Sequence, residues 1–307
     1  METANKDALK RILLFVFITF SLTLAYRFII LYPQVQSEAS GIVPAVPTQL
    51  LVAAVMFFPS LGVLLTRLIT REGFKNSWLK PNIGKNLRFY LLAWFGPGVL
   101  SVLGSALYFL LIKGSFDPTL GFMRLTLEFY VTAADAMPAQ LAPMLFSQFV
   151  QALLLSPILN FVLCFGEEWG WRGYLLPKIS EKLSTLPALF ITGIIWGLWH
   201  APLTAIGHNY GVGYAGFPFT GIGMMCLFCI VIGIFLSYVS LKTKSCIPAV
   251  LGHGAFNGIA KTGMYLTADG GDPFVGPAPT GIIGMIPFII AAVLILVSLS
   301  GHKKETA

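Results

Sequence analysis

Eight long apolar runs lie along the whole chain, and they limit its fold more than any other feature of the sequence. A helix needs about 20 apolar residues to cross the hydrocarbon core of a bilayer. Only helices and closed barrels satisfy every backbone polar group there. We therefore expect an all-α, polytopic membrane helical bundle with about eight transmembrane helices. The runs cover residues 13–32, 50–70, 89–112, 144–176, 186–203, 217–240, 246–266 and 281–300.

The composition agrees with a bilayer as the main solvent. Of the 307 residues, 56% are apolar and 11% are charged, whereas soluble domains carry about 25% charged residues. The net charge of +7 does not indicate a nucleic-acid partner, because the basic residues lie in short loops and form no long block. In such loops, lysine and arginine set the topology and contact anionic lipid.

The lysines and arginines alternate between the two sides of the predicted membrane. With the amino terminus in the cytoplasm, all but four of the 20 basic residues fall in inner segments. The four outer ones are Arg27, Lys113, Arg124 and Lys261. Because basic residues concentrate on the cytoplasmic side, we expect an even number of spans with both termini cytoplasmic. The short tails and compact loops favour an integral, multi-pass protein of a prokaryotic plasma membrane.

Ionisable side chains inside the apolar runs mark a candidate functional site, because a charge in hydrocarbon is costly. Glu167 lies in the fourth run, His200 in the fifth and His253 in the seventh. Glu167 and His200 are nearly equidistant from a polar hairpin at 178–184, so antiparallel helices would place them at similar depth. Asn257 follows His253 by four residues and projects from the same helix face. These groups are predicted to meet in a pocket that opens to the cytoplasm.

A purely structural interpretation is also open. The polar groups could form a hydrogen-bond network that holds the helices together, and the glycines beside them would then serve only close helix packing. An amide pair would join the helices at less cost than two carboxylates and two histidines, which favours a functional site. His208, in a glycine-rich outer loop, and His302, in the tail, are expected to be solvated or interfacial.

Three short motifs follow one another along the chain: Glu167-Glu168-x-x-x-Arg172, Trp196-x-x-x-His200 and His253-x-x-x-Asn257. They resemble, in the same order, those of the CPBP family of intramembrane proteases, which includes the type II CAAX prenyl endopeptidases. Trp196 is a departure, because the second motif of the family usually begins with Phe, but an aromatic wall is kept. The resemblance predicts a catalytic core over 140–265. The apolar runs predict amino-terminal helices and an interfacial segment over 1–139 and a last helix with a basic tail over 266–307.

The resemblance implies an endopeptidase that hydrolyses a peptide bond with an activated water. Glu167 would be the general base and His200 would hold the same water. His253 and Asn257 would bind the negative charge that develops on the carbonyl oxygen.

Supporting residues are expected around this set. Glu168 and Arg172 are four residues apart, which suits an ion pair on one helix. We expect this pair to neutralise one buried charge and to orient Glu167, with Trp196 as an aromatic wall.

Zinc is a second prediction for the same donors. Two imidazoles and a carboxylate, here His200, His253 and Glu167, suit a zinc ion with water in the open position. The conventional label of the family is metalloprotease, although the chain has no HExxH helix. Whether the chemistry uses zinc or the glutamate alone is left open by the residues.

The expected partners are a polypeptide substrate, prenylated or otherwise membrane-associated, and the lipid bilayer. Two other functions remain open. One is a non-proteolytic protein on the same scaffold, such as a bacteriocin-immunity factor or an adaptor. The other is a proton-coupled transporter that uses the buried acid and imidazole groups as a relay. Transporters often contain two related halves, and the first three runs hold no matching polar set, which favours the enzyme.

Overall fold

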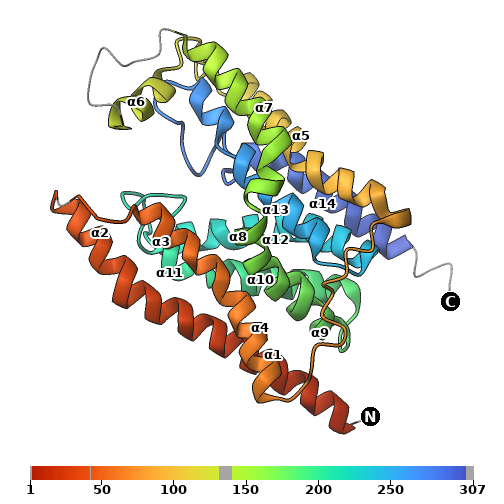
Figure 1. Cartoon of the computed structure of the whole chain (residues 1–307). Coiled ribbons are helices and arrows are strands. Elements are labelled where there is room, and N and C mark those ends of the chain that lie inside the picture. The colour runs from red at the N-terminus through yellow and green to blue at the C-terminus, as the bar shows by residue number, and fades with distance from the viewer. Residues whose placement is uncertain (1, 42, 131–139, 302–307) are drawn as a thin grey trace.

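The computed structural model describes residues 2–41, 43–130 and 140–301, which form helices joined by turns and loops (Figure 1). Among these residues, one isolated β-bridge pairs Asp272 with Gly276. Seven helical stretches of the described chain are long and apolar enough to cross a membrane. The predicted all-α, multi-pass membrane bundle is therefore confirmed.

The helices follow one another with few long connections. The first part of the chain forms α1 (Glu2–Tyr26), α2 (Tyr32–Ala39), α3 (Thr48–Ala54), α4 (Phe58–Ile69), α5 (Leu87–Leu111) and α6 (Gly121–Tyr130). The remainder forms α7 (Leu141–Leu159), α8 (Phe161–Gly170), α9 (Leu176–Ser180), α10 (Thr185–Trp199), α11 (Ala201–Thr204), α12 (Phe219–Thr243), α13 (Ile247–Ile259) and α14 (Ile282–Gly301). Short π-helical turns at Arg27–Leu31 and Trp171–Leu175 extend α1 and α8. The domain boundary expected at residue 139 falls outside the described residues.

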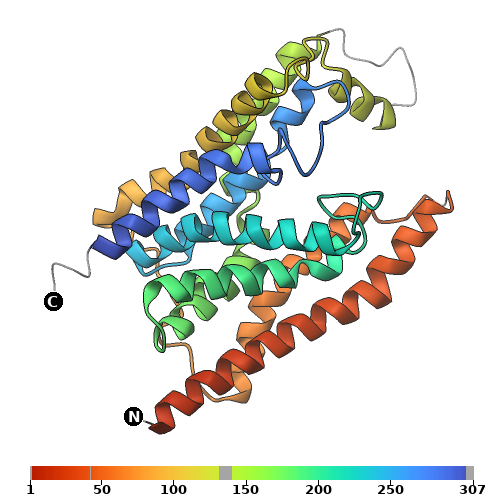
Figure 2. The ribbon, with the colours of Figure 1, turned by 180° about the vertical axis from the view of Figure 1, so that it is seen from behind.

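Two groups of helices flank a central one (Figures 1 and 2). On one side α1 packs on α4, and α4 packs on α8. On the other side α5 packs on α13 and α14, and α7 packs on α13. The centre holds α8, α10, α12 and α13. Of these, α8, α10 and α13 carry the three motifs, and α12 packs against α10 and α13. The first turns of α1 and the last turns of α14 lie at the same side of the molecule in both views, and their placement in the cytoplasm stays a prediction.

The fourth apolar run is not the single helix that hydropathy predicts. It is broken at Asn160, between α7 and α8. Pro157, in the last turn of α7, cannot donate a backbone hydrogen bond. The Asn160 amide bonds the carbonyls of Ser156 at 3.1 Å and Gly254 at 3.3 Å, which ties the break to α13. The break lets α8 leave the line of α7 and enter the centre of the bundle.

The seventh run also differs from the prediction of a full transmembrane helix. The helix there, α13, has 13 residues, which span about 20 Å at 1.5 Å per residue. That length is short of the hydrocarbon core, about 30 Å thick. A 3₁₀ turn at Thr262–Leu266 continues the chain toward the loop before α14. The run therefore places His253 near the middle of a short, buried helix.

Two glycines let α8 approach α4 closely. A Cβ atom added at Gly166 would lie 2.6 Å from the backbone carbonyl oxygen of Met56, and one added at Gly170 would overlap Pro59. Gly166→Ala is expected to lower the free energy of unfolding by about 1–3 kcal/mol, because the backbone of the 3₁₀ turn Val55–Phe57, which leads into α4, must move. Thermal or denaturant unfolding in detergent measures the change. Gly223→Ala is the matched control, since nothing lies within 4 Å of its added Cβ. Equal stability of the two variants would contradict the predicted close packing.

A charged cluster joins the other end of α8 to the amino-terminal helices. The carboxylate of Glu72 accepts a hydrogen bond from Tyr174 at 2.9 Å and pairs with the Lys178 ammonium at 2.6 Å. Arg11 of α1 lies 3.8 Å from the same carboxylate. Burial alone would raise the pKa of Glu72, but the hydrogen bonds from Lys178 and Tyr174 outweigh it and hold that pKa below its ordinary value. The cluster therefore holds the end of the first-motif segment against α1 and α4.

Candidate active site

The two acidic residues of the first motif are buried on α8 and face different neighbours. Successive residues of a helix point about 100° apart. Glu167 is 3% exposed and bonds to α10, whereas Glu168 is 0% exposed and bonds to α13. The two carboxylates therefore belong to different parts of the site.

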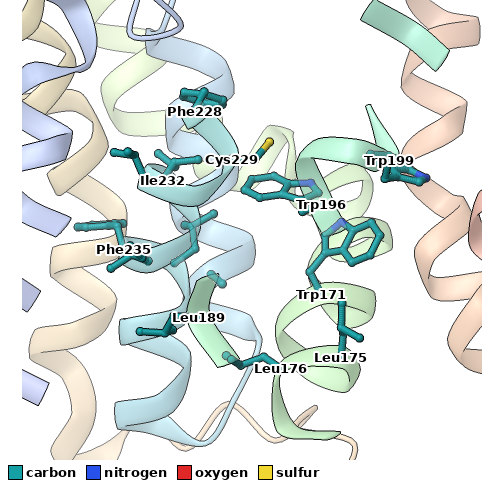
Figure 3. Packing of buried hydrophobic residues seen from close by; sticks show 14 of the residues in the cluster. Trp171, Leu175, Leu176, Leu189, Trp196, Trp199, Phe228, Cys229, Ile232 and Phe235 are labelled. Carbon is teal, nitrogen blue, oxygen red and sulfur yellow. The ribbon is translucent and has the colours of Figure 1, made fainter. Parts of the chain in front are cut away.

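Two tryptophans hold the carboxylate of Glu167. The indole nitrogen Nε1 of Trp196 donates to Oε2 at 2.8 Å, and that of Trp171 donates to the same oxygen at 3.3 Å. Figure 3 shows the two indoles side by side, with their nitrogens close together. The sequence analysis did not identify Trp171. The available signal was its spacing of four residues from Glu167, which places both side chains on one helix face.

The predicted ion pair between Glu168 and Arg172 is present. Nη1 of Arg172 lies 2.9 Å and 3.0 Å from the two carboxylate oxygens. Oε1 of Glu168 also accepts a hydrogen bond from Nδ1 of His253, at 2.8 Å. The hydrogen bonds of the pair reach His253 on α13, and the expectation that the pair orients Glu167 stays a prediction. The choice of partner depends on which helix faces Glu168, and the sequence does not contain that information.

The hydrogen bonds of the two histidines define which ring nitrogen is free. Nδ1 of His200 lies 2.9 Å from the carbonyl oxygen of Trp196, which can only accept, so Nδ1 carries the hydrogen. Nδ1 of His253 likewise donates to the carboxylate of Glu168. In both rings Nε2 is left to bind water or substrate. The hydrogen bond from Nδ1 also fixes the orientation of each ring.

Trp196 lies at the centre of the predicted constellation. Its ring centroid is 5.8 Å from that of His200 and 5.6 Å from that of His253. The guanidinium carbon of Arg172 lies 4.1 Å above the indole ring, within the range of a cation–π contact. Because the same indole donates to Glu167, the site is built around one aromatic side chain.

Asn257 lies at the edge of the site and not among the buried groups. It is exposed, one helical turn from His253, and its side-chain nitrogen is 3.7 Å from the sulfur of Cys164. The structure thus gathers Glu167, His200 and His253 around Trp196 and leaves Asn257 at the rim.

A further histidine, His208, lies beside the site. Its ring is nearly parallel to that of His200, with an interplanar angle of 8° and centroids 6.5 Å apart. The residue is half-buried. His208 therefore packs beside His200 and is not simply solvated, and an interfacial position stays a prediction. The loop that carries His208 turns back over the end of α10, and no spacing in the sequence indicates this.

The three ionisable side chains of the predicted pocket are buried. Glu167, His200 and His253 are exposed by 3%, 7% and 7%. A cavity of about 450 Å³ lies between α5 and α14 and is lined by apolar residues away from the site. His200 follows the 15 residues of α10, about 22 Å from the hairpin at 181–184. An opening toward the cytoplasm therefore stays a prediction.

The arrangement of the donors bears on the zinc prediction. Among the described residues, no group of three or more His, Cys, Asp or Glu side chains is placed to hold a metal ion. A catalytic zinc site ordinarily takes three protein ligands and a water. Oε2 of Glu167 already accepts two indole hydrogen bonds. The donors as arranged do not fit such a site, so we derive no step through zinc, and the zinc requirement stays a prediction.

The fold and the site together define a class: an integral, multi-pass helical membrane protein with a buried acid and two oriented imidazoles between its helices. Residues 148–259 match the family model described as type II CAAX prenyl endopeptidase Rce1-like. The resemblance that the motifs predict is thus confirmed for this segment, which is similar to the Rce1-like family. It contains all three motifs.

Two curated relatives match the same region. "CAAX prenyl protease 2" of Methanococcus maripaludis is 31% identical over 134 residues, which are 42% of this chain and 45% of the relative. "Lysostaphin resistance protein A" of Staphylococcus haemolyticus is 29% identical over 139 residues, which are 44% of this chain and 35% of the relative. The similarity therefore spans less than half of the length of either relative.

Proposed function

We propose that the chain is an intramembrane endopeptidase that hydrolyses a peptide bond with water activated by Glu167. One observation carries this proposal. The side chains of Glu167, His200 and His253 are gathered around Trp196. A hydrogen bond to Oε2 holds the carboxylate, and a hydrogen bond from Nδ1 holds each imidazole and leaves its Nε2 free. General acid–base catalysis needs such fixed groups within reach of one water. The match to the Rce1-like family supports the same reaction class.

In the proposed reaction, Glu167 takes a proton from water while the water oxygen attacks the carbonyl carbon of the peptide. Nε2 of His200 accepts a hydrogen bond from the same water and orients it. The carboxylate of Glu168 stabilises the imidazolium form of His253, in which Nε2 donates to the developing oxyanion. Asn257 supplies a neutral donor from the rim. The proton held by Glu167 then passes to the leaving amine as the C–N bond breaks.

The proposed substrate is a polypeptide at the membrane. A relative named a CAAX prenyl protease supports a substrate with a prenylated carboxyl-terminal segment. The buried position of the site supports a substrate that enters from, or is held by, the bilayer. A prokaryotic plasma membrane is the proposed location.

The second candidate is a non-proteolytic membrane protein on the same scaffold. The relative named for lysostaphin resistance favours it, since that name describes resistance and no cleavage. A proton-coupled transporter has less support, because the polar groups gather on α8, α10 and α13 without a matching set in α1–α5 of the described chain. A direct assay of cleavage separates the endopeptidase from both.

The experiment is reconstitution in liposomes with a library of lipid-anchored peptides, followed by mass spectrometry of the new carboxyl termini. The wild-type protein is expected to cleave a subset of the library, and Glu167→Gln is expected to leave it intact. Glu181→Gln is the matched control, because Glu181 is an exposed carboxylate of the hairpin. Equal cleavage by wild type and Glu167→Gln would refute the proposal. In the same assay, loss of cleavage with a chelator and its recovery with added Zn²⁺ would support the zinc prediction.

A further inference from the structure

Trp196 makes a contact that the usual residue of its motif is unable to make. The second motif of the resembled family usually begins with Phe, which has no hydrogen-bond donor. The indole N–H of Trp196 donates to Oε2 of Glu167 at 2.8 Å, a distance typical of a bond to a charged acceptor. The position therefore carries a polar function in this chain as well as an aromatic wall.

The two indole hydrogen bonds reach only one of the two carboxylate oxygens. Trp196 and Trp171 both donate to Oε2 of Glu167. No hydrogen bond from the described residues reaches Oε1. Bonding at Oε2 reduces the basicity of that oxygen and fixes the plane of the carboxylate. Oε1 is then the oxygen available to a water molecule.

Packing fixes the indole in this position. Trp196 is 2% exposed, with the guanidinium of Arg172 above its ring at 4.1 Å and His253 at its edge, 5.6 Å between centroids. A side chain held at one face and at its edge does not need to reorganise when the reaction begins. Hydrogen-bond donors that are already in position stabilise charge more strongly in a site that excludes water.

We propose that Trp196 is a positioning residue for Glu167: its indole N–H holds Oε2 and directs Oε1 to receive the proton of the attacking water. This inference rests on the proposed role of Glu167 as general base. Trp171 has the same role with a longer and weaker hydrogen bond. The proton moves from water to Oε1, and the remaining hydroxide bonds the peptide carbonyl carbon, so the step needs no other reactant.

The first test compares three Trp→Phe variants in the peptide assay. Trp196→Phe keeps an aromatic ring and loses the donor, and kcat is expected to fall about ten- to hundredfold. KM is expected to stay within about twofold, because the lost contact acts on the reacting water and not on the peptide. Trp171→Phe is expected to lower kcat less, since its bond is 3.3 Å long.

Trp199→Phe is the matched control. Its buried indole N–H donates to Thr23 of α1 at 2.7 Å, so the variant also loses one hydrogen bond but none to Glu167. Its kcat is expected to stay within about twofold of wild type. A loss in Trp199→Phe as large as that in Trp196→Phe would overturn the inference, since the effect would then be structural.

The second test is independent of activity. The chain has six tryptophans, and ¹⁵N-labelled indoles give one N–H signal each, which the Trp→Phe variants assign. Glu167→Gln is expected to shift the signals of Trp171 and Trp196 and to leave the other four in place. Unmoved signals would overturn the contact. If Glu167→Gln abolishes cleavage but Trp196→Phe cleaves as fast as wild type, only the positioning role is overturned. If the wild-type protein itself does not cleave, the proposed function is overturned.

Discussion

Glu167→Gln is expected to lower kcat for peptide hydrolysis by about a thousandfold or more, because general-base catalysis contributes about 10²–10⁴-fold to rates. Glutamine has nearly the same shape, and its carbonyl oxygen still accepts the indole hydrogen bonds of Trp171 and Trp196. The variant loses only the basic oxygen. The measurement is kcat in the reconstituted peptide assay.

The folded state provides the control for this result. Removing a buried charge that is held by neutral donors does not leave an unpaired partner. The unfolding temperature of Glu167→Gln in detergent is therefore expected to equal or exceed that of wild type. A variant that is inactive because it fails to fold would lose its cooperative transition, and a fully active, folded variant would remove Glu167 from the mechanism.

Arg172→Met is expected to give the largest loss of stability. Both members of the Glu168–Arg172 pair are 0% exposed. Removal of one partner from a buried ion pair typically costs 3–5 kcal/mol, because the other charge stays buried without compensation. We expect a loss of about that size in the free energy of unfolding, measured by denaturant titration in detergent. The cation–π contact with Trp196 is lost in the same variant.

A double variant separates the lost pair from the lost volume. Arg172→Met combined with Glu168→Gln leaves no unpaired charge, and the amide can still accept the hydrogen bond from Nδ1 of His253. The double variant is expected to recover more than half of the stability that the single variant loses. If the double variant is no more stable than Arg172→Met, the charge pair is not the source of the effect.

The sequence predicts the membrane bundle and most of the site because both depend on local patterns. Apolar runs near 20 residues are sufficient to define a multi-pass protein. The cost of a charge in hydrocarbon singles out Glu167, His200 and His253. The Glu168–Arg172 pair follows from helix geometry alone. These inferences need no knowledge of which helices are neighbours.

The remaining features depend on tertiary contacts that no local pattern contains. The break at Asn160 is invisible to hydropathy, because the residues around it stay apolar on average. The partner of Glu168 is decided by the approach of α13, and the donors to Glu167 are decided by the approach of α10. Asn257 shares a helix face with His253, yet the end of α13 places it at the rim.

The contacts between α8 and the amino-terminal helices limit how far the chain can be truncated. The family-matched segment begins at residue 148, but the wall against which its first motif packs comes from α4, and Glu72 secures its far end. A fragment cut to the family boundaries would expose the glycine face of α8 to lipid and leave Lys178 without that acidic partner. The unit needed for the proposed hydrolysis therefore extends beyond the three motifs, because the amino-terminal helices support the helix that carries the first of them.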